Sequence, residues 1–319
     1  MRRRRMLALL GAAAAGGCAS PPSPPASQPR TLAPGVYLLP GSGGTADAHN
    51  LGRIANAGFI VGERGVLVVD TGTSFAHGRA ILAAVRSVTD KPVKLALVTH
   101  ARPEFLFGGP AFQDAGIPVR MHDRAAQLMA ARCDGCLKQL RQTVGAVGMA
   151  GTAMYRPDQV FGAAHTVEGL GRAVRVLYFG HASGPGDVAV LDEASGTLFA
   201  GGLLDAARVP DIQDGELPAW HRALASLRGE RLTTIVPGHG APGSPALIDA
   251  VDAYLAALET RMRALVEAGA SLIDLPAAGE LPAYAHWDQY ETIHRRNAST
   301  AFLRAEREWM FRQPREGRP

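Results

Sequence analysis

Residues 97–109 read LVTHARPEFLFGG and contain the most informative pattern of the chain. The apolar run from Val93 to Thr99 predicts a β-strand, and His100 follows it directly. Arg102 and Glu104 come shortly afterwards. Because α/β sheets place their ligands at the C-terminal ends of strands, we expect the functional site in this loop.

The segments before this loop predict a hairpin and a helix. Two apolar runs, residues 56–62 and 66–72, flank the short turn Glu63-Arg64-Gly65, which is typical of a β-hairpin. Apolar residues then recur at helical spacing over residues 76–88. A hairpin, a helix and a strand therefore lead to His100.

Two further histidines follow predicted strands later in the chain. His181 comes after a strand over residues 175–179, and His239 follows a strand over residues 233–236. Between them, a strand over residues 197–200 ends in Gly201-Gly202. All three histidines thus come at or shortly after the ends of predicted strands.

In order and spacing, these segments resemble the metallo-β-lactamase superfamily. In that family a strand ends in His-x-His-x-Asp-His, and the motif binds two zinc ions. Here His100 occupies the first position of the motif. Arg102, Glu104 and Phe105 occupy the other three positions. The resemblance therefore implies a two-metal fold in which most of the ligand loop has been replaced.

Residues 81–93 and 296–302 look most like the quinoprotein relay system zinc metallohydrolases within this superfamily. The similarity extends from about Gly35 to Trp309. It implies an αββα four-layer sandwich of two mixed sheets, whereas the interleaved strands and helices alone indicate only an α/β fold. We expect one such domain over residues 35–311, followed by a short polar tail, residues 312–319.

Transferred by position, the ligands of the family do not complete two zinc sites. Arg102 replaces one imidazole, Phe105 replaces another, and Gly202 stands where a bridging Asp or Cys is expected. Each ion would have about two protein ligands instead of about four. We therefore expect at most one zinc ion. The side chains that the resemblance leaves for it are His100, His181, His239 and Glu104, the last as a ligand or as a general base.

Arg102 opposes even a single-ion site. A guanidinium about 4 Å from a divalent ion repels it by several kcal/mol at an effective dielectric near 20. Unless its head group turns away, the pocket is an anion site, and the histidines are a hydrogen-bonded remnant. Asp70 and Asp187 match structural carboxylates of the fold that hold loops. Asp205 is a further candidate for the missing bridge.

The N-terminus has the layout of a secretory signal. Four arginines precede a short apolar run and Gly16-Gly17-Cys18. We expect a signal peptide over residues 1–17 and a lipidated Cys18, with a non-lipidated exported product as the alternative. The Pro- and Ser-rich segment 18–34 would then be a tether. This places the protein in the periplasm, anchored to a membrane.

The remaining cysteines, Cys133 and Cys136, lie in a predicted helix over residues 124–142. An oxidising compartment favours a short structural disulfide between them. A redox centre and half of a metal site are the alternatives, although neither a second cysteine pair nor a haem-attachment motif supports them.

Charge and motifs exclude several classes of function. The chain has 33 basic and 29 acidic residues, and loss of Arg2–Arg5 with the signal would balance them, so nucleic acid is not expected as a partner. Neither a serine-hydrolase elbow nor a phosphate-binding loop is present.

Two functional hypotheses remain. The first is an exported hydrolase that uses at most one metal-activated water on a small ester, lactone, thioester or amide. The second is an inactive descendant whose pocket binds an anionic ligand or a partner protein. In both cases the resemblance suggests a periplasmic quinoprotein as a partner.

Overall fold

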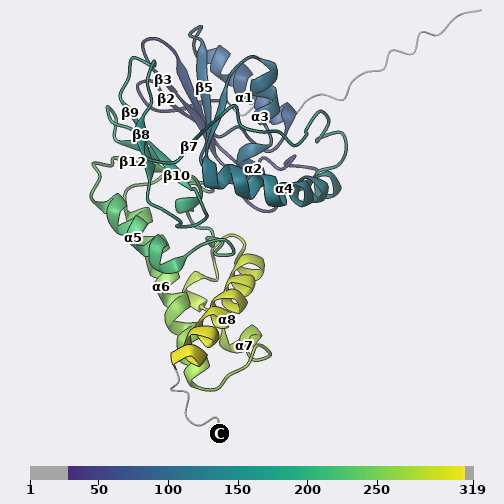
Figure 1. The fold of residues 1–319 in the computed structure, drawn as a ribbon, viewed down its shortest axis with the longest axis vertical. Helices are drawn as coiled ribbons and strands as arrows, with labels where there is room; N and C mark the ends of the chain where they lie inside the picture. The colour runs from purple at the N-terminus through teal and green to yellow at the C-terminus, as the bar shows by residue number, and fades with distance from the viewer. Residues whose placement is uncertain (1–27, 313–319) are drawn as a thin grey trace, which may run out of the picture.

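The computed structural model describes residues 28–312. Two mixed β-sheets lie face to face, and helices cover both outer surfaces (Figure 1). The predicted αββα sandwich is therefore confirmed. None of the helices in the described part of the chain is long and apolar enough to cross a bilayer. The expected signal peptide and Cys18 lie outside the described residues.

The first sheet has seven strands in the order β1 to β7. Their bounds are β1 Arg30–Ala33, β2 Val36–Leu39, β3 Ala57–Val61, β4 Val66–Val69, β5 Val93–Val98, β6 Val119–His122 and β7 Gln159–Phe161. Strands β1 to β4 pair antiparallel, and β4 to β7 pair parallel. The predicted hairpin is β3–β4, and β5 ends just before His100, as expected.

The second sheet has five strands in the order β12-β11-β10-β9-β8. Their bounds are β8 His165–Thr166, β9 Val174–Tyr178, β10 Val188–Asp192, β11 Thr197–Phe199 and β12 Thr234–Val236. Only β11 and β12 pair parallel. Strands β9, β11 and β12 agree with the sequence prediction to within about a residue. Strand β8 was missed, as were β1, β2 and β7 of the first sheet, because short edge strands carry little periodic signal.

The helices divide between the two outer faces. The first sheet is covered by α1 (Phe75–Val88), α2 (Pro103–Leu106), α3 (Gly109–Asp114) and α4 (Asp123–Thr143). The second is covered by α5 (Leu217–Arg228), α6 (Ala246–Glu267) and α8 (Arg295–Arg312), with the short α7 (Leu275–Ala278) beside them. A third apolar cluster, drawn from both sheets, fills the space between them. The core therefore lies in three layers.

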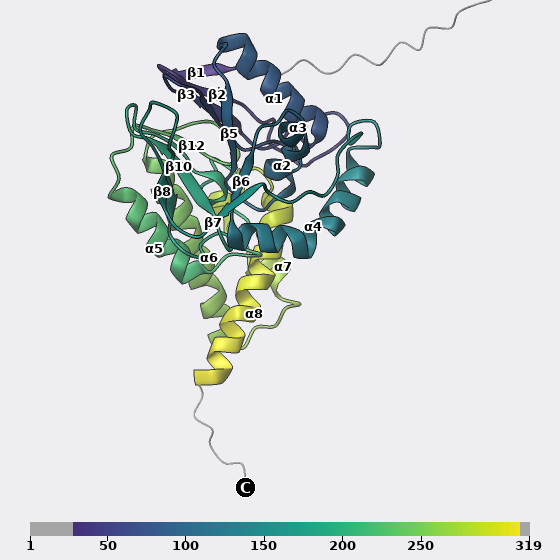
Figure 2. The ribbon, with the colours of Figure 1, turned by 45° about the horizontal axis from the view of Figure 1, so that its top comes forward.

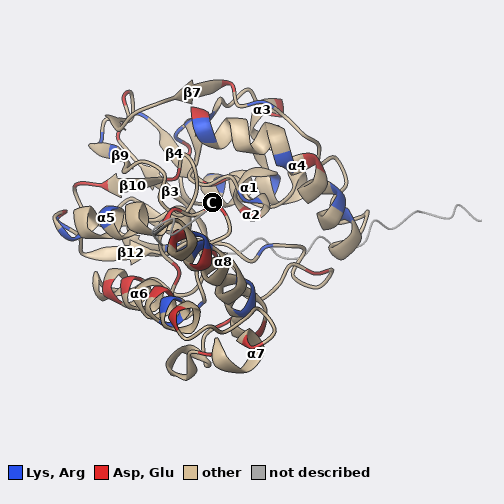
Figure 3. Ribbon diagram, turned by 60° about the horizontal axis from the view of Figure 1, so that its bottom comes forward, with Lys and Arg blue, Asp and Glu red and all other residues tan. Residues whose placement is uncertain are grey.

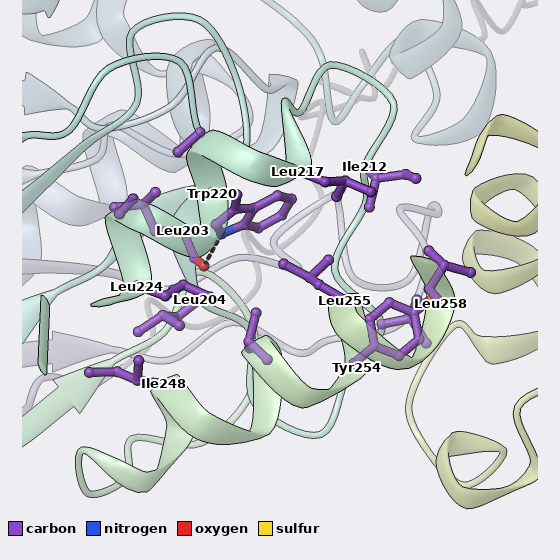
Figure 4. Packing of buried hydrophobic residues seen from close by; sticks show 14 of the residues in the cluster. Leu203, Leu204, Ile212, Leu217, Trp220, Leu224, Ile248, Tyr254, Leu255 and Leu258 are labelled. Atoms are coloured by element: carbon purple, nitrogen blue, oxygen red, sulfur yellow. Dashed lines mark hydrogen bonds between the residues drawn. The ribbon is translucent and has the colours of Figure 1, made fainter. Parts of the chain in front are cut away.

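Trp220 of α5 is the largest fully buried side chain and lies at the centre of the cluster beneath the second sheet (Figure 4). Its indole N–H donates to the carbonyl oxygen of Leu203 over 3.1 Å. Leu203 ends a 3-10 turn, Gly201–Leu203, which directly follows β11. Packing around Trp220 thus fixes the turn that carries Gly202.

The C-terminal helix differs from the sequence prediction at its start. Apolar residues at helical spacing predict one helix over residues 288–310, but α8 begins at Arg295 and follows a π-helical turn, Tyr290–His294. Figure 2 shows α8 extending beneath the sandwich beside α6. Asn297 donates to the carbonyl oxygen of Pro210 over 2.7 Å, and Arg304 donates to that of Gly215 over 2.8 Å. Helix α8 therefore holds the loop between Leu204 and Glu216.

Candidate functional site

Asp70, at the end of β4, anchors the loop that begins the site. Its Oδ1 accepts from the Thr99 backbone N–H over 2.8 Å and from the Thr99 hydroxyl over 2.9 Å. Burial raises the pKa of Asp70 to about 7, although both hydrogen bonds oppose this shift. Asp70 is thus a structural carboxylate, as expected from the sequence, and it fixes the residue before His100.

His100 is buried, and its ring has two close neighbours. Its Nδ1 hydrogen-bonds the carboxylate of Asp187, which also accepts from the Ser183 hydroxyl. The other neighbour is Gly202, where a Cβ atom would lie only 2.5 Å from His100 Nδ1. The ring of His100 therefore fills the space into which a side chain at residue 202 would project. Asp187 holds an imidazole, and not only a loop as the sequence suggested.

His239, after β12, is held by Asp205. The Oδ1 atom of Asp205 lies 2.8 Å from His239 Nδ1 and accepts from the His239 backbone N–H over 2.9 Å. His239 Nε2 is buried without a hydrogen bond, and Glu104 Oε1 lies 3.3 Å from it. Asp205 is therefore a partner of His239 and not the bridging ligand that the sequence left open.

The charges around His239 favour the ionised forms of both partners. Burial opposes a charged imidazole, but Asp205 and Glu104 outweigh it and raise the pKa of His239. Burial likewise opposes a charged carboxylate, but His239 and Arg102 outweigh it and lower the pKa of Glu104 to about 2. Glu104 and Asp205 thus flank the two ring nitrogens of His239, and their negative charges favour the protonated imidazole.

Phe105 separates the two buried histidines. Its ring centroid lies 5.8 Å from that of His100 and 5.6 Å from that of His239, both in edge-on arrangements. The phenyl ring is fully buried and belongs to the core cluster beneath the first sheet. A buried phenyl ring therefore occupies the position that the resemblance assigned to a metal-binding imidazole.

His181 does not join the other two histidines. It is half-buried, and its Nε2 lies 2.5 Å from the carbonyl oxygen of Asp214. Asp214 belongs to the loop that α8 holds, and its carboxylate also pairs with Arg132 of α4. The expected convergence of three imidazoles is therefore not present, because a backbone carbonyl engages the third ring.

Arg102 points toward the same loop. Its Nη2 donates to the carbonyl oxygen of Asp211 over 2.9 Å and lies 3.8 Å from Asp211 Oδ2. Burial would lower the pKa of Arg102, but the charges of Asp211, Glu104, Asp205 and Asp187 outweigh it and raise the pKa. Arg102 is therefore a fixed cation among carboxylates, and its head group is engaged by Asp211.

The described residues do not fit a zinc ion. Among them, no group of three or more His, Cys, Asp or Glu side chains is arranged to hold a metal. Glu104 and His239 form a single ligand pair, and Phe105 separates them from His100. Two donors fall short of the roughly four that zinc prefers. Arg102 supplies a positive charge within this group of carboxylates.

A family model described as the metallo-beta-lactamase superfamily matches residues 51–239. The chain belongs to this superfamily. The match begins just before β3 and ends at His239. It therefore includes strands β3 to β12 but neither β1 and β2 nor the helices α6 to α8. The superfamily typically binds zinc, whereas the described residues of this chain contain no group of three or more side chains placed to hold a metal.

Solved structures of superfamily members share the fold. A metallo-beta-lactamase from Pontibacter korlensis has a TM-score of 0.59 and 20% identity, over 72% of this chain and 98% of that one. A metallo beta lactamase from Hirschia baltica has a TM-score of 0.57 and 19% identity, over 72% of this chain and 96% of that one. These likenesses establish the fold alone.

One curated relative matches a short segment. The linear primary-alkylsulfatase of Pseudomonas sp. (strain ATCC 19151) is 40% identical over 53 residues, which is 17% of this chain. The matched part is only 10% of that protein. The relative's activity is therefore evidence for a proposal and not for an assignment.

Sequence reasoning missed several partners of the predicted site residues. Asp211 and Asp214 lie in an irregular loop, and Ser183 lies in the turn after His181. No periodic pattern marks such residues. Asp205 was noticed by its place three residues after Gly202, but its role depends on where β12 delivers His239.

Proposed function

We propose that this superfamily member has lost metal-dependent hydrolysis and acts by binding another molecule. The observation that carries this proposal is the Phe105 ring, which lies between His100 and His239. Hydrolysis in this fold requires ligands that converge on an ion. The contact of His181 with the Asp214 carbonyl and the packing of His100 on Gly202 support the same conclusion.

The charges around Arg102 argue against an anionic ligand, so we propose a partner protein as the bound molecule. Glu104, Asp187, Asp205 and Asp211 all act on Arg102, whose head group donates to the Asp211 carbonyl. An anion entering this group would meet several carboxylates and a cation that is already paired. Basic and acidic residues are interspersed on the face formed by α6 and α8, which gives no support to a nucleic-acid partner (Figure 3).

A single-ion hydrolase is the second candidate function. The observation that favours it is His239, whose Nδ1 is held by Asp205 while its buried Nε2 faces Glu104. Metal-binding histidines are commonly oriented by a carboxylate in this way. The substrates to test are small esters, lactones, thioesters and amides, and an alkyl sulfate is added because of the 53-residue match to the alkylsulfatase.

Metal analysis separates the two candidates. We expect protein purified without added metal to contain far less than one zinc per chain by plasma mass spectrometry. Added zinc should not raise the melting temperature, whereas an ion at a hundred times its dissociation constant would stabilise the fold by about 2.7 kcal/mol. The substrate panel should show no hydrolysis above that of a His239→Ala control. One tight zinc per chain that His239→Ala removes would overturn the proposal and support the hydrolase.

We also propose that the protein is exported, anchored through Cys18, and associated with a periplasmic quinoprotein system. The Arg-rich start, the apolar run and the Pro-rich spacer of the sequence support export, and the likeness of residues 81–93 and 296–302 supports the quinoprotein link. Intact-mass analysis of native protein should find a lipidated N-terminus at Cys18, and Cys18→Ser should release the protein from membranes. An unmodified Cys18, or a mature chain that starts elsewhere, would contradict the anchor.

A further inference from the structure

Two thiols lie side by side in the middle of α4. Cys133 is 1% exposed and belongs to the same apolar cluster as Phe105, whereas Cys136 is half-buried. Cys136 follows Cys133 by three residues, about one helical turn, and its thiol donates to the carbonyl oxygen of Arg132 over 3.6 Å. The structure has both as free thiols, so the disulfide expected from the sequence stays a prediction for the oxidised protein.

A disulfide between these residues would strain the helix. Residues three apart in a helix have Cβ atoms about 5–6 Å apart, whereas a disulfide requires roughly 3.5–4.5 Å. Helix α4 is continuous from Asp123 to Thr143, so bond formation must open it locally. Gly135 lies between the cysteines, where a side chain would meet open space. Because glycine weakens a helix, α4 is easiest to open at this position.

We propose that Cys133 and Cys136 form a site of reversible thiol–disulfide exchange with a low-molecular-weight disulfide. Strained disulfides are readily reduced, so the bond would be labile and not structural. Cys136 is only half-buried and is therefore the point of entry. A small disulfide reaches such a sulfur more easily than a disulfide on the surface of a folded protein.

The exchange balances in two steps. The Cys136 thiolate attacks one sulfur of a disulfide R–S–S–R, forms a mixed disulfide and releases R–S⁻. Cys133 then gives its proton to solvent and attacks Cys136 Sγ, which forms the internal disulfide and releases the second R–S⁻. The two thiolates take up the two protons, and two electrons pass from the cysteine pair to the reagent. In support of this order, the interaction with the Cys133 thiol lowers the pKa of Cys136 to about 7.

The pair is connected to the candidate site through Arg132. This residue precedes Cys133 and pairs with the carboxylate of Asp214, whose carbonyl oxygen engages His181. Opening of α4 at residues 132–136 should weaken the contact between Arg132 and Asp214. Hydrogen exchange of residues 211–216 should therefore be faster in the oxidised protein than in the reduced protein.

Oxidation in glutathione buffers tests the proposal on the full-length chain. Glutathione disulfide, followed by alkylation and peptide mass spectrometry, should yield the Cys133–Cys136 disulfide, and reduced glutathione should reverse it. Cys133→Ser should stop at a glutathione adduct on Cys136. Cys136→Ser should react at least tenfold more slowly, because Cys133 is buried. Oxidised protein should melt at a lower temperature than reduced protein.

Gly135→Ala tests the role of helix opening. Alanine stiffens the helix without a clash, so the equilibrium constant for disulfide formation should fall about fivefold. Lys138→Ala, on the exposed side of the same helix, is the matched control and should leave the equilibrium constant for disulfide formation unchanged. A disulfide that raises the melting temperature and resists reduced glutathione would identify a structural bond and overturn the proposal. Thiols that stay reduced in glutathione disulfide would overturn it as well.

Discussion

Replacement of Arg102 by methionine should lower the free energy of unfolding by roughly 3 kcal/mol, because loss of one partner leaves buried charges uncompensated. Arg102 donates to the carbonyl oxygen of Asp211, and its positive charge lowers the pKa of Glu104. Its side chain is only 21% exposed, so water cannot replace it fully. Urea unfolding at neutral pH, followed by circular dichroism, measures the loss.

Arg296 provides a matched control, since it binds the same aspartate from the surface. Its Nη2 lies 2.5 Å from Asp211 Oδ2, but its side chain is 48% exposed. Arg296→Met should therefore cost less than about 1 kcal/mol, as exposed ion pairs generally do. Arg102→Lys should fall between the two, because lysine keeps the charge and loses the planar fork. Equal losses for Arg102→Met and Arg296→Met would show that Arg102 is an ordinary surface residue.

A stabilising Arg102 also bears on the metal. If the guanidinium only blocked an ion, its removal would improve zinc binding and leave stability unchanged. If it compensates the carboxylates of Glu104, Asp187 and Asp205, removal destabilises the fold and zinc does not rescue it. Urea unfolding of Arg102→Met should therefore be repeated with added zinc. Rescue by zinc would indicate a metal site that Arg102 blocks, and no rescue would indicate that Arg102 has taken the place of the ion as the positive charge among the carboxylates.

The elements that deliver the site were predictable, but the directions of its side chains were not. The apolar runs that became β5 and β12 place His100 and His239 at strand ends, and both strands were expected from periodicity. The position of the Phe105 ring, in edge-on contact with both histidines, follows from how Phe105 of α2 packs in the core. That packing is a tertiary property, and no local pattern in the sequence encodes it.

His181 shows the same limit over a longer range. Its strand β9 was predicted, yet its ring turns to the Asp214 carbonyl, which lies in a loop held by Arg304 and Asn297 of α8. The position of that carbonyl depends on a helix more than eighty residues further along the chain. A motif comparison assigns a ligand to His181 by position and cannot include such a contact.

His77 should make the stability of the protein depend steeply on pH. It lies in the first turn of α1, is 8% exposed, and its Nδ1 accepts from the Thr73 backbone N–H over 3.2 Å. Burial, aided by the positive charge of Arg53, lowers the pKa of His77 to about 3. Thr71, in the same loop, bonds the carbonyl oxygens of Phe105 and Leu106. His77 therefore supports the loop that positions α2.

The sign of the effect follows from the direction of that shift. The unfolded chain binds a proton at His77 below about pH 6.5, whereas the folded chain binds it only near pH 3. Stability from this residue is thus complete above pH 6.5 and is lost progressively as the pH falls toward 3. The full loss is on the order of 5 kcal/mol, at about 1.4 kcal/mol per pH unit over the shift from 6.5 to about 3.

Urea unfolding of the wild type and of His77→Asn between pH 7 and pH 4 tests the contribution of His77 to this pH dependence. The amide oxygen of asparagine can replace Nδ1 as the acceptor of the Thr73 N–H. The variant should show a shallower fall in unfolding free energy than the wild type, with a difference of about 3 kcal/mol across this range. His49→Asn, at an exposed histidine, should keep the wild-type dependence. If His77→Asn and the wild type lose stability in parallel, the buried imidazole is not the group that titrates, and the loop ahead of α2 must be held by other contacts.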